Sequence, residues 1–185
     1  MPFEDSYIGR NALILLSLKA ASRLQGRIKV QKILYLSNLC GWNCIKDYRY
    51  YNYGPYSDSI STDLETFKRN GWIHEETFGS ADGKQGHTYY LTSQGQKIAD
   101  SLAGKIENPG LIKRTTELVE ALNNYTSDDL EIMSTLVFLS RSEPNLSERD
   151  LISRVVELKP RFDEKQVRGN LRVFRMLKDF GYAAK

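Results

Sequence analysis

The chain has 185 residues, of which 41% are hydrophobic and 26% are charged, a composition typical of a globular protein of one domain or two small ones. Its formal net charge of +3 is small, so a basic surface for nucleic acid would have to come from local clustering. The first ten residues lack the apolar core of a signal peptide, and the longest apolar run, Ala12–Leu18, is too short to span a bilayer. With two cysteines, these features predict a reduced, cytoplasmic protein without a membrane partner.

Two helices are predicted at the start of the chain. The first covers 7–24, with apolar residues on one face: Leu13, Leu16, Ala20 and Leu24. The second covers 27–39, has a broad apolar surface and ends before Gly41. Both helices therefore contribute to one hydrophobic core.

The residues Tyr48–Asp58, which we call the tyrosine segment, follow the second helix and include five tyrosines. Aromatic residues favour an extended conformation, and a residue before proline is disfavoured in the helical region, so Gly54 and Pro55 predict a stiff turn. Ser57 is a typical N-cap residue. The segment therefore connects the second helix rigidly to a third helix over 57–70.

A β-hairpin and a further helix come next. Two strands, 72–76 and 87–91, flank the glycine-rich stretch 79–86. Thr92 caps a fourth helix that runs to Leu102. Three helices, a hairpin and a returning helix follow the order of a winged helix domain.

The remainder is predicted to be helical. Asn108-Pro109-Gly110 marks a boundary between an amino-terminal domain over 1–107 and a carboxy-terminal domain over 108–185. A linking helix over 111–122 precedes three helices spaced like a helix-turn-helix bundle. The first of the three is expected to be capped by Ser127 or Asp128, the second to open at Ser147, and the third to be capped by Asp163 and to end near Gly181. The predicted fold class is mainly α with a β-hairpin, a winged helix-turn-helix-like domain followed by a helical domain.

Two stretches carry a family resemblance. Gly26–Leu36, with Gln31 and Lys32 at its centre, resembles the R-x-K-L-Q-K-x-x-Y-L signature of YwgA-like bacterial and archaeal proteins, with Val30 in place of the usual leucine. Tyr50–Ser57 with the following Asp-Leu and Gly-Trp-Ile is similar to their second signature, Y-x-Y-G-P-Y-S. A more distant likeness runs to the Panacea domain of toxin–antitoxin systems. These resemblances imply a winged-helix-like fold, an antitoxin or regulatory role and no catalytic residue.

The end of the predicted hairpin is similar to the exit from the wing in many winged helix regulators. The stretch Tyr89–Ile98 carries the pattern Y-x-L-T-x-x-G. In this pattern Thr92 caps the next helix, and the small Gly95 allows that helix to approach the sheet closely. The pattern favours the fold and does not identify a ligand.

A row of cations is predicted on the last helix, and we call it the basic row: Lys165, Arg168, Arg172 and Arg175. Spacings of three, four and three residues place these side chains on one helical face, which could lie against DNA phosphates, together with Lys84 at the hairpin tip. The alternative is a solvated face of a helix end. The third helix carries Asp58, Asp63 and Glu65 and is a poor DNA reader.

The second candidate site is the tyrosine segment with the neighbouring helix. Its residues are Gln31, Lys32, Tyr53, Gly54, Pro55 and Tyr56. The structural interpretation is a cation over a tyrosine ring or a polar network behind the Gly-Pro turn, and it is favoured here. The functional interpretation is a phosphate or peptide pocket.

Metal and catalytic sites have little support. Cys40, Cys44, His74 and His87 lack the spacing of a zinc finger, so buried free thiols are expected. Glu75 and Glu76 are neighbours on a strand and point to opposite faces, so they cannot act on one substrate atom together. No phosphate loop or nucleophile elbow occurs, and we expect neither enzyme activity nor a cofactor.

Two functions remain open. The first is a winged-helix DNA-binding transcriptional regulator, which would be a cytoplasmic homodimer that contacts DNA through the basic row. The second is an antitoxin or adaptor that binds a partner protein, such as a toxin, through the tyrosine segment and the third helix.

Overall fold

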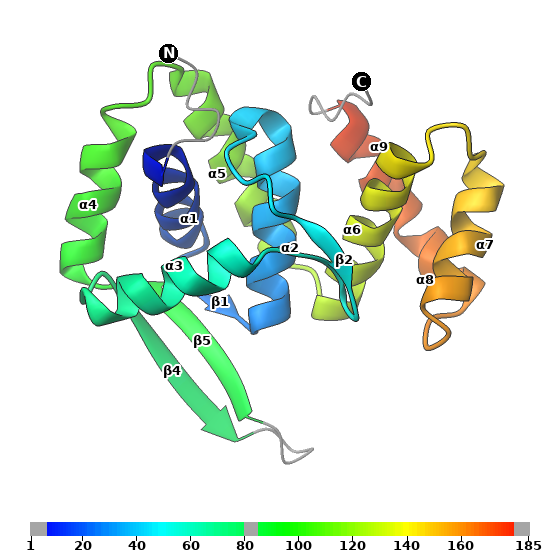
Figure 1. The fold of residues 1–185 in the computed structure, drawn as a ribbon, viewed down its shortest axis with the longest axis horizontal. Coiled ribbons are helices and arrows are strands. Elements are labelled where there is room, and N and C mark those ends of the chain that lie inside the picture. Colours follow the sequence, from blue (N-terminus) through cyan, green and yellow to red (C-terminus); the bar gives the residue numbers. More distant parts are fainter. Residues whose placement is uncertain (1–6, 80–84, 180–185) are drawn as a thin grey trace.

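The computed structural model describes residues 7–79 and 85–179. The protein is mainly helical with a small antiparallel sheet. Figure 1 shows the hairpin of β4 (Ile73–Gly79) and β5 (Gln85–Leu91) extending away from the helices. The amino-terminal helices are α1 (Tyr7–Ala21), α2 (Arg27–Ser37), the π-helical turn η1 (Asn38–Trp42), α3 (Asp58–Arg69) and α4 (Ser93–Ala103). The later helices are α5 (Pro109–Asn123), α6 (Ser127–Ser142), α7 (Glu148–Leu158), α8 (Glu164–Gly169) and α9 (Leu171–Asp179).

Two small sheets accompany the helices. In the first, β5 (Gln85–Leu91) lies between β1 (Leu24–Gln25) and β4 (Ile73–Gly79), and all pairs are antiparallel. In the second, β2 (Arg49–Tyr51) pairs with β3 (Gly54–Tyr56). The predicted hairpin over 72–91 is therefore confirmed, and the tyrosine segment forms a second hairpin. Lys84 lies outside the described residues.

The helix α1 lies at the centre of the core. Its residues from Asn11 to Leu18 are all buried, because α1 packs against α4 and α5 and also contacts α2 and β5. A helix that is apolar on all sides requires cover on all sides. One continuous cluster of buried hydrophobic residues joins the helices on both sides of the predicted boundary at Asn108. Asn108 itself caps α5, and the division into two domains stays a prediction.

Two predicted helix ends are wrong. The first helix ends at Ala21 and not at Leu24, because Leu24 and Gln25 form β1 and pair with β5. The helix α6 is capped by neither Ser127 nor Asp128. Thr126 caps it instead, in a capping box in which the Thr126 hydroxyl and the Asp129 carboxylate each accept a backbone N–H of the other residue.

The last helix is not continuous. Asp163 caps α8 as predicted, but α8 ends at Gly169, and α9 begins at Leu171. Asn170 lies at the break, where its side-chain amide donates to the Gln166 carbonyl at 3.0 Å and to Asp129 Oδ1 at 3.2 Å. The basic row is therefore divided between two helices.

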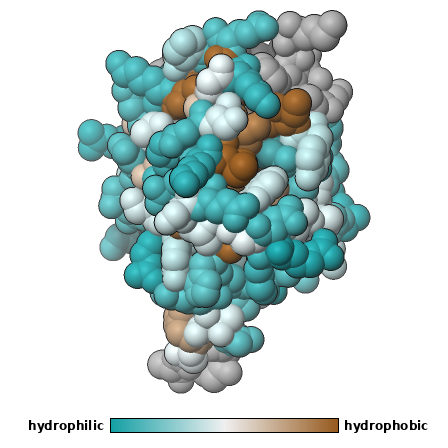
Figure 2. Space-filling model, turned by 90° about the vertical axis from the view of Figure 1, so that its left-hand side faces the viewer, coloured by the Kyte–Doolittle hydropathy of each residue, from teal (hydrophilic) through white to brown (hydrophobic). Residues whose placement is uncertain are grey.

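The caps of α3, α4 and α7 are where the sequence predicts them, at Ser57, Thr92 and Ser147. None of the helices within the described ranges combines the length and hydrophobicity needed to cross a bilayer. Figure 2 shows the face on the α4 side, which is largely hydrophilic apart from hydrophobic residues gathered in its upper part.

Candidate functional site

The tyrosine segment turns back on itself as a short hairpin. Tyr50 lies opposite Pro55, and Tyr51 lies opposite Gly54. Gly54 has a φ of +86°, and a Cβ atom there would lie 3.0 Å from the Thr135 hydroxyl of α6. Both the backbone conformation and the close approach to α6 therefore require glycine at this turn.

Gln31 of α2 attaches the end of this hairpin to the core. Its side-chain amide donates to the Ser57 carbonyl at 3.0 Å, and its side-chain oxygen accepts the Ser57 N–H at 3.1 Å. Gln31 is buried, so these bonds satisfy polar groups that would otherwise be unpaired. Ser57 in turn caps α3. The pairing explains why the Gln-Lys pair and the Tyr-Gly-Pro-Tyr-Ser stretch belong to one structural unit.

Lys32 lies on the other side of the turn. Its side chain is almost completely buried, with the residue 2% exposed, and Nζ donates to the Pro55 carbonyl at 2.6 Å. Burial lowers the pKa of the amine to about 7, while Glu131 raises it and Lys159 lowers it further. The predicted polar network behind the Gly-Pro turn is therefore present. Among the described residues, the cations that lie over tyrosine rings of this segment are Arg49, Lys159 and Arg161, not Lys32.

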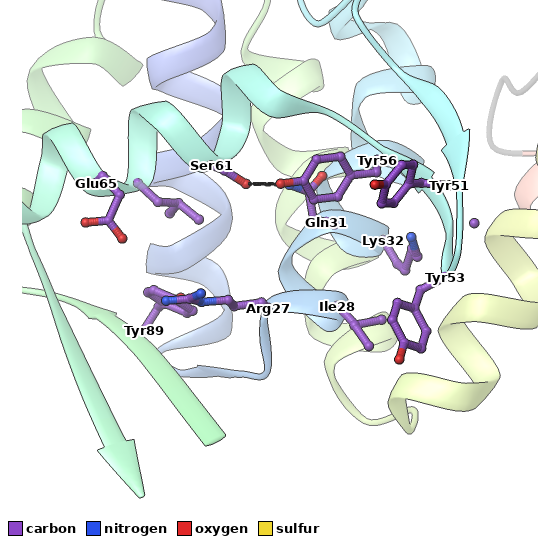
Figure 3. Close-up of a pocket in the computed structure, with 12 residues that line it drawn as sticks. Arg27, Ile28, Gln31, Lys32, Tyr51, Tyr53, Tyr56, Ser61, Glu65 and Tyr89 are labelled. Carbon is purple, nitrogen blue, oxygen red and sulfur yellow. Dashed lines mark hydrogen bonds between the residues drawn. The ribbon is translucent and has the colours of Figure 1, made fainter. Parts of the chain in front are cut away.

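A groove with a volume of about 460 Å³ runs along the exposed side of α2, between α3 and the β2–β3 hairpin. Figure 3 shows its floor, which is formed by four residues of α2: Arg27, Ile28, Gln31 and Lys32. Tyr51 and Tyr53 border it on the hairpin side and are more than half exposed, at 56% and 51%. Leu64 and Glu65 border it on the α3 side. Its size and its aromatic and aliphatic lining are typical of a binding site.

Two hydrogen-bonded groups hold the walls of the groove in place. Tyr56 and Ser61 share a hydrogen bond of 2.9 Å between their hydroxyls, which joins the hairpin to α3. At the end near the sheet, Glu75 accepts hydrogen bonds from Tyr89 at 2.7 Å and Lys68 at 2.6 Å, and Arg27 lies at 3.2 Å. Burial acts to raise the pKa of Glu75, but these donors outweigh it and hold the pKa at about 2.

Glu75 and Glu76 have separate partners, as their neighbouring positions on a strand predict. The side chain of Glu75 is buried at the sheet end of the groove, whereas Glu76 is exposed and forms an ion pair with Arg23. They therefore do not form a carboxylate pair on one substrate.

A buried ion cluster, not predicted from the sequence, lies beside the groove. Glu131 of α6 is fully buried, with Lys159 Nζ 3.2 Å from Oε1 and Arg161 Nη2 2.7 Å from Oε2. Lys159 also donates to the Asn52 carbonyl and lies over the Tyr50 ring at 5.0 Å. The cluster therefore attaches the tip of the β2–β3 hairpin to the segment that follows α7. A signal was present in the sequence, since Glu131 interrupts an apolar helix.

The structure does not bring the basic row together as one cationic surface. Arg168 is paired with Glu164 at 2.5 Å, and Arg175 is paired with Glu148 at 2.6 Å. Lys165 and Arg172 are exposed and have no ion pair with another residue in the described ranges. Two of the four charges are thus neutralised locally.

The two cysteines are buried thiols outside any disulfide, as predicted, and burial raises the pKa of Cys40 to about 11. Across 7–79 and 85–179, no group of three or more His, Cys, Asp or Glu residues is placed to hold a metal ion.

The fold and groove define a mainly helical protein with a small antiparallel sheet and a recess built around a tyrosine-rich hairpin. Over 118 residues, which make up 64% of this chain and 67% of the relative, the sequence is 25% identical to the uncharacterised protein YwgA of Bacillus subtilis strain 168. No family model matches the chain. The similarity supports the resemblance to YwgA-like proteins. It suggests no activity for this chain, because that relative is uncharacterised.

Proposed function

We propose that this chain is a protein-interaction module of the antitoxin or adaptor type, which holds a segment of a partner protein in the groove beside the tyrosine segment. The observation that carries the proposal is the groove itself, bordered by the exposed rings of Tyr51 and Tyr53. Tyrosines at a protein surface supply large contact areas at low entropic cost and are enriched where proteins bind one another. The resemblance to the Panacea domain of toxin–antitoxin systems adds support.

The walls of the groove favour binding without a large rearrangement. Gln31 and Lys32 attach the hairpin to α2, and the Tyr56–Ser61 hydrogen bond attaches it to α3. A preformed site avoids part of the entropy loss that accompanies binding. The groove is therefore suited to an extended or helical segment that contributes apolar side chains.

Filling the groove should abolish binding. A library of random 12-residue peptides displayed on phage would be selected against the full chain, and peptides that survive would be measured by fluorescence anisotropy. We expect Glu65→Trp to weaken their binding at least about tenfold, because Glu65 is an exposed residue of α3 that borders the groove, and the indole would occupy the space of the peptide.

The matched control is Thr66→Trp, one residue further along α3, which does not line the groove. It should leave peptide affinity unchanged. Failure to select any peptide, or equal affinity for the wild type and Glu65→Trp, would contradict the proposed function.

The second candidate is a DNA-binding transcriptional regulator, which is favoured by the exposed Lys165 and Arg172 without ion pairs in the described part of the chain. In this function, Arg168→Glu combined with Arg172→Glu would reduce affinity for random duplex DNA at least about tenfold, and wild-type binding would weaken steeply with salt. A gel shift at two salt concentrations measures both effects.

The control for this experiment has the same charge change elsewhere, Lys97→Glu combined with Lys113→Glu. Both lysines are exposed on other helices. If the arginine variant binds duplex DNA as the wild type does, DNA is not bound through the basic row.

A further inference from the structure

Lys32 has N–H donors that no other residue within 7–79 and 85–179 accepts. Its Nζ makes one hydrogen bond, to the Pro55 carbonyl, and it forms no ion pair with any residue that the structure describes. A protonated lysine carries three N–H donors. A buried ammonium without a carboxylate in contact is costly, and Lys32 lines the floor of the groove.

The charges around Lys32 do not compensate it fully. On α6, Glu131 is already bound by Lys159 and Arg161, both of which come from the segment after α7. Arg161 also pairs with Asp128 at 3.0 Å. Three cations therefore face two carboxylates in this region. The other titratable groups that border the groove are the phenols of the hairpin and of β5, the guanidinium of Arg27 and the carboxylate of Glu65. Arg27 is held by hydrogen bonds to Glu75 and Tyr89.

The distribution of charge along the groove is uneven. Figure 3 shows Glu65 and Lys32 near opposite ends of the groove, with Ile28 beside Lys32. A single negative group placed at the Lys32 end would face a net positive region and remain distant from Glu65. A dianionic phosphate fits less well, because the groove is mainly aromatic and aliphatic and Arg27 already has partners.

We infer that the groove recognises an Asp or Glu side chain of the partner polypeptide, whose carboxylate accepts hydrogen bonds from Lys32 Nζ while neighbouring apolar side chains of the partner contact Ile28, Leu64 and Tyr53. The inference rests on the proposed function of the groove. It specifies the chemistry of the partner segment, which geometry alone leaves open.

Binding of this kind is coupled to protonation. The pKa of Lys32 in the free protein is about 7, lowered chiefly by burial, and a carboxylate in contact raises it. Below pH 7 the amine is already charged, so binding takes up no proton. Above pH 7 binding takes up a proton at Lys32, and affinity decreases by up to about tenfold per pH unit until the pKa of the complex is reached.

The test uses the selected 12-residue peptides and the full wild-type chain, so it does not depend on a variant that folds poorly. Each peptide with Asp or Glu is compared with its Asn or Gln counterpart by calorimetry at pH 6 and pH 8, in two buffers of different ionisation enthalpy. We expect the amide counterpart to bind at least about tenfold more weakly at pH 6. We also expect proton uptake at pH 8 that is absent at pH 6.

A Lys32→Met variant, checked for a native circular dichroism spectrum, should bind both members of a pair equally and show no proton uptake. The control Lys97→Met, at an exposed lysine of α4, should behave as the wild type. Peptides whose binding is lost with Glu65→Trp bind in the groove. If such peptides need no carboxylate or show no proton uptake, the inference is overturned and the proposed function stays intact. Peptides indifferent to Glu65→Trp would overturn both.

Discussion

Replacing Glu131 by glutamine is expected to lower the free energy of unfolding by about 3–5 kcal/mol, because it leaves the buried Lys159 without a counter-charge and takes one of two carboxylates from the more exposed Arg161. Lys159 is 5% exposed and depends on Glu131 and on the Asn52 carbonyl, and Arg161 depends on Glu131 and Asp128. Glutamine has nearly the same shape, so the loss reports on charge and not on a cavity. Urea denaturation followed by circular dichroism measures it.

The control is Glu164→Gln, which breaks the exposed ion pair with Arg168 on α8. Exposed pairs within one helix contribute roughly 0.5 kcal/mol or less. If the two variants unfold at the same urea concentration, Glu131 does not stabilise the attachment between the hairpin and the segment after α7. A Glu131→Gln variant with native stability would also remove the reason for treating this cluster as a fixed support of the groove.

Local sequence patterns predict the structure correctly where that structure depends on one residue and its near neighbours in the chain. Ser57, Thr92 and Ser147 are N-caps because each presents a hydroxyl to the backbone N–H three residues later. The antiparallel β4–β5 hairpin follows from aromatic strands on either side of a glycine-rich stretch. These features depend on interactions within a few residues.

Features that depend on distant partners could not be predicted in this way. Leu24 satisfies a helical pattern, yet it lies in a strand because β5, more than sixty positions away, pairs with it. Asn170 breaks the last helix partly through Asp129, which belongs to another helix. The same limit explains the basic row, since Glu148 of α7 removes Arg175 from any common cationic surface.

The groove was predicted in part. The sequence identified Gln31, Lys32 and the tyrosine segment as neighbours, and the structure shows that Gln31 binds the Ser57 backbone and Lys32 binds the Pro55 carbonyl. The recess between them and α3 depends on where Leu64 and Glu65 lie, which requires the packing of α3. Glu131 was overlooked because a single acidic residue in an apolar helix does not reveal its partners in the sequence.

A substitution where α4 packs on the sheet is expected to have the second large effect on stability. Gly95→Ala is expected to lower the free energy of unfolding by about 3 kcal/mol, because a Cβ atom at this position would lie 1.8 Å from the Trp72 carbonyl oxygen. That carbonyl cannot move away freely, since it accepts the Thr92 N–H at 3.0 Å and the Thr92 hydroxyl at 3.2 Å. The added methyl group therefore forces α4 away from the residue that directly precedes β4.

Gly169→Ala is the matched control, because it adds the same methyl group at the end of α8, where a Cβ atom would meet nothing within 4 Å. This variant should be neutral or more stable by roughly 0.4–1 kcal/mol, since alanine reduces the conformational entropy of the unfolded chain. Thermal and urea denaturation of the two variants side by side separate close packing from helix propensity. Equal stability of both variants would mean that α4 can shift on the sheet, and that the approach at Gly95 is not what fixes its position.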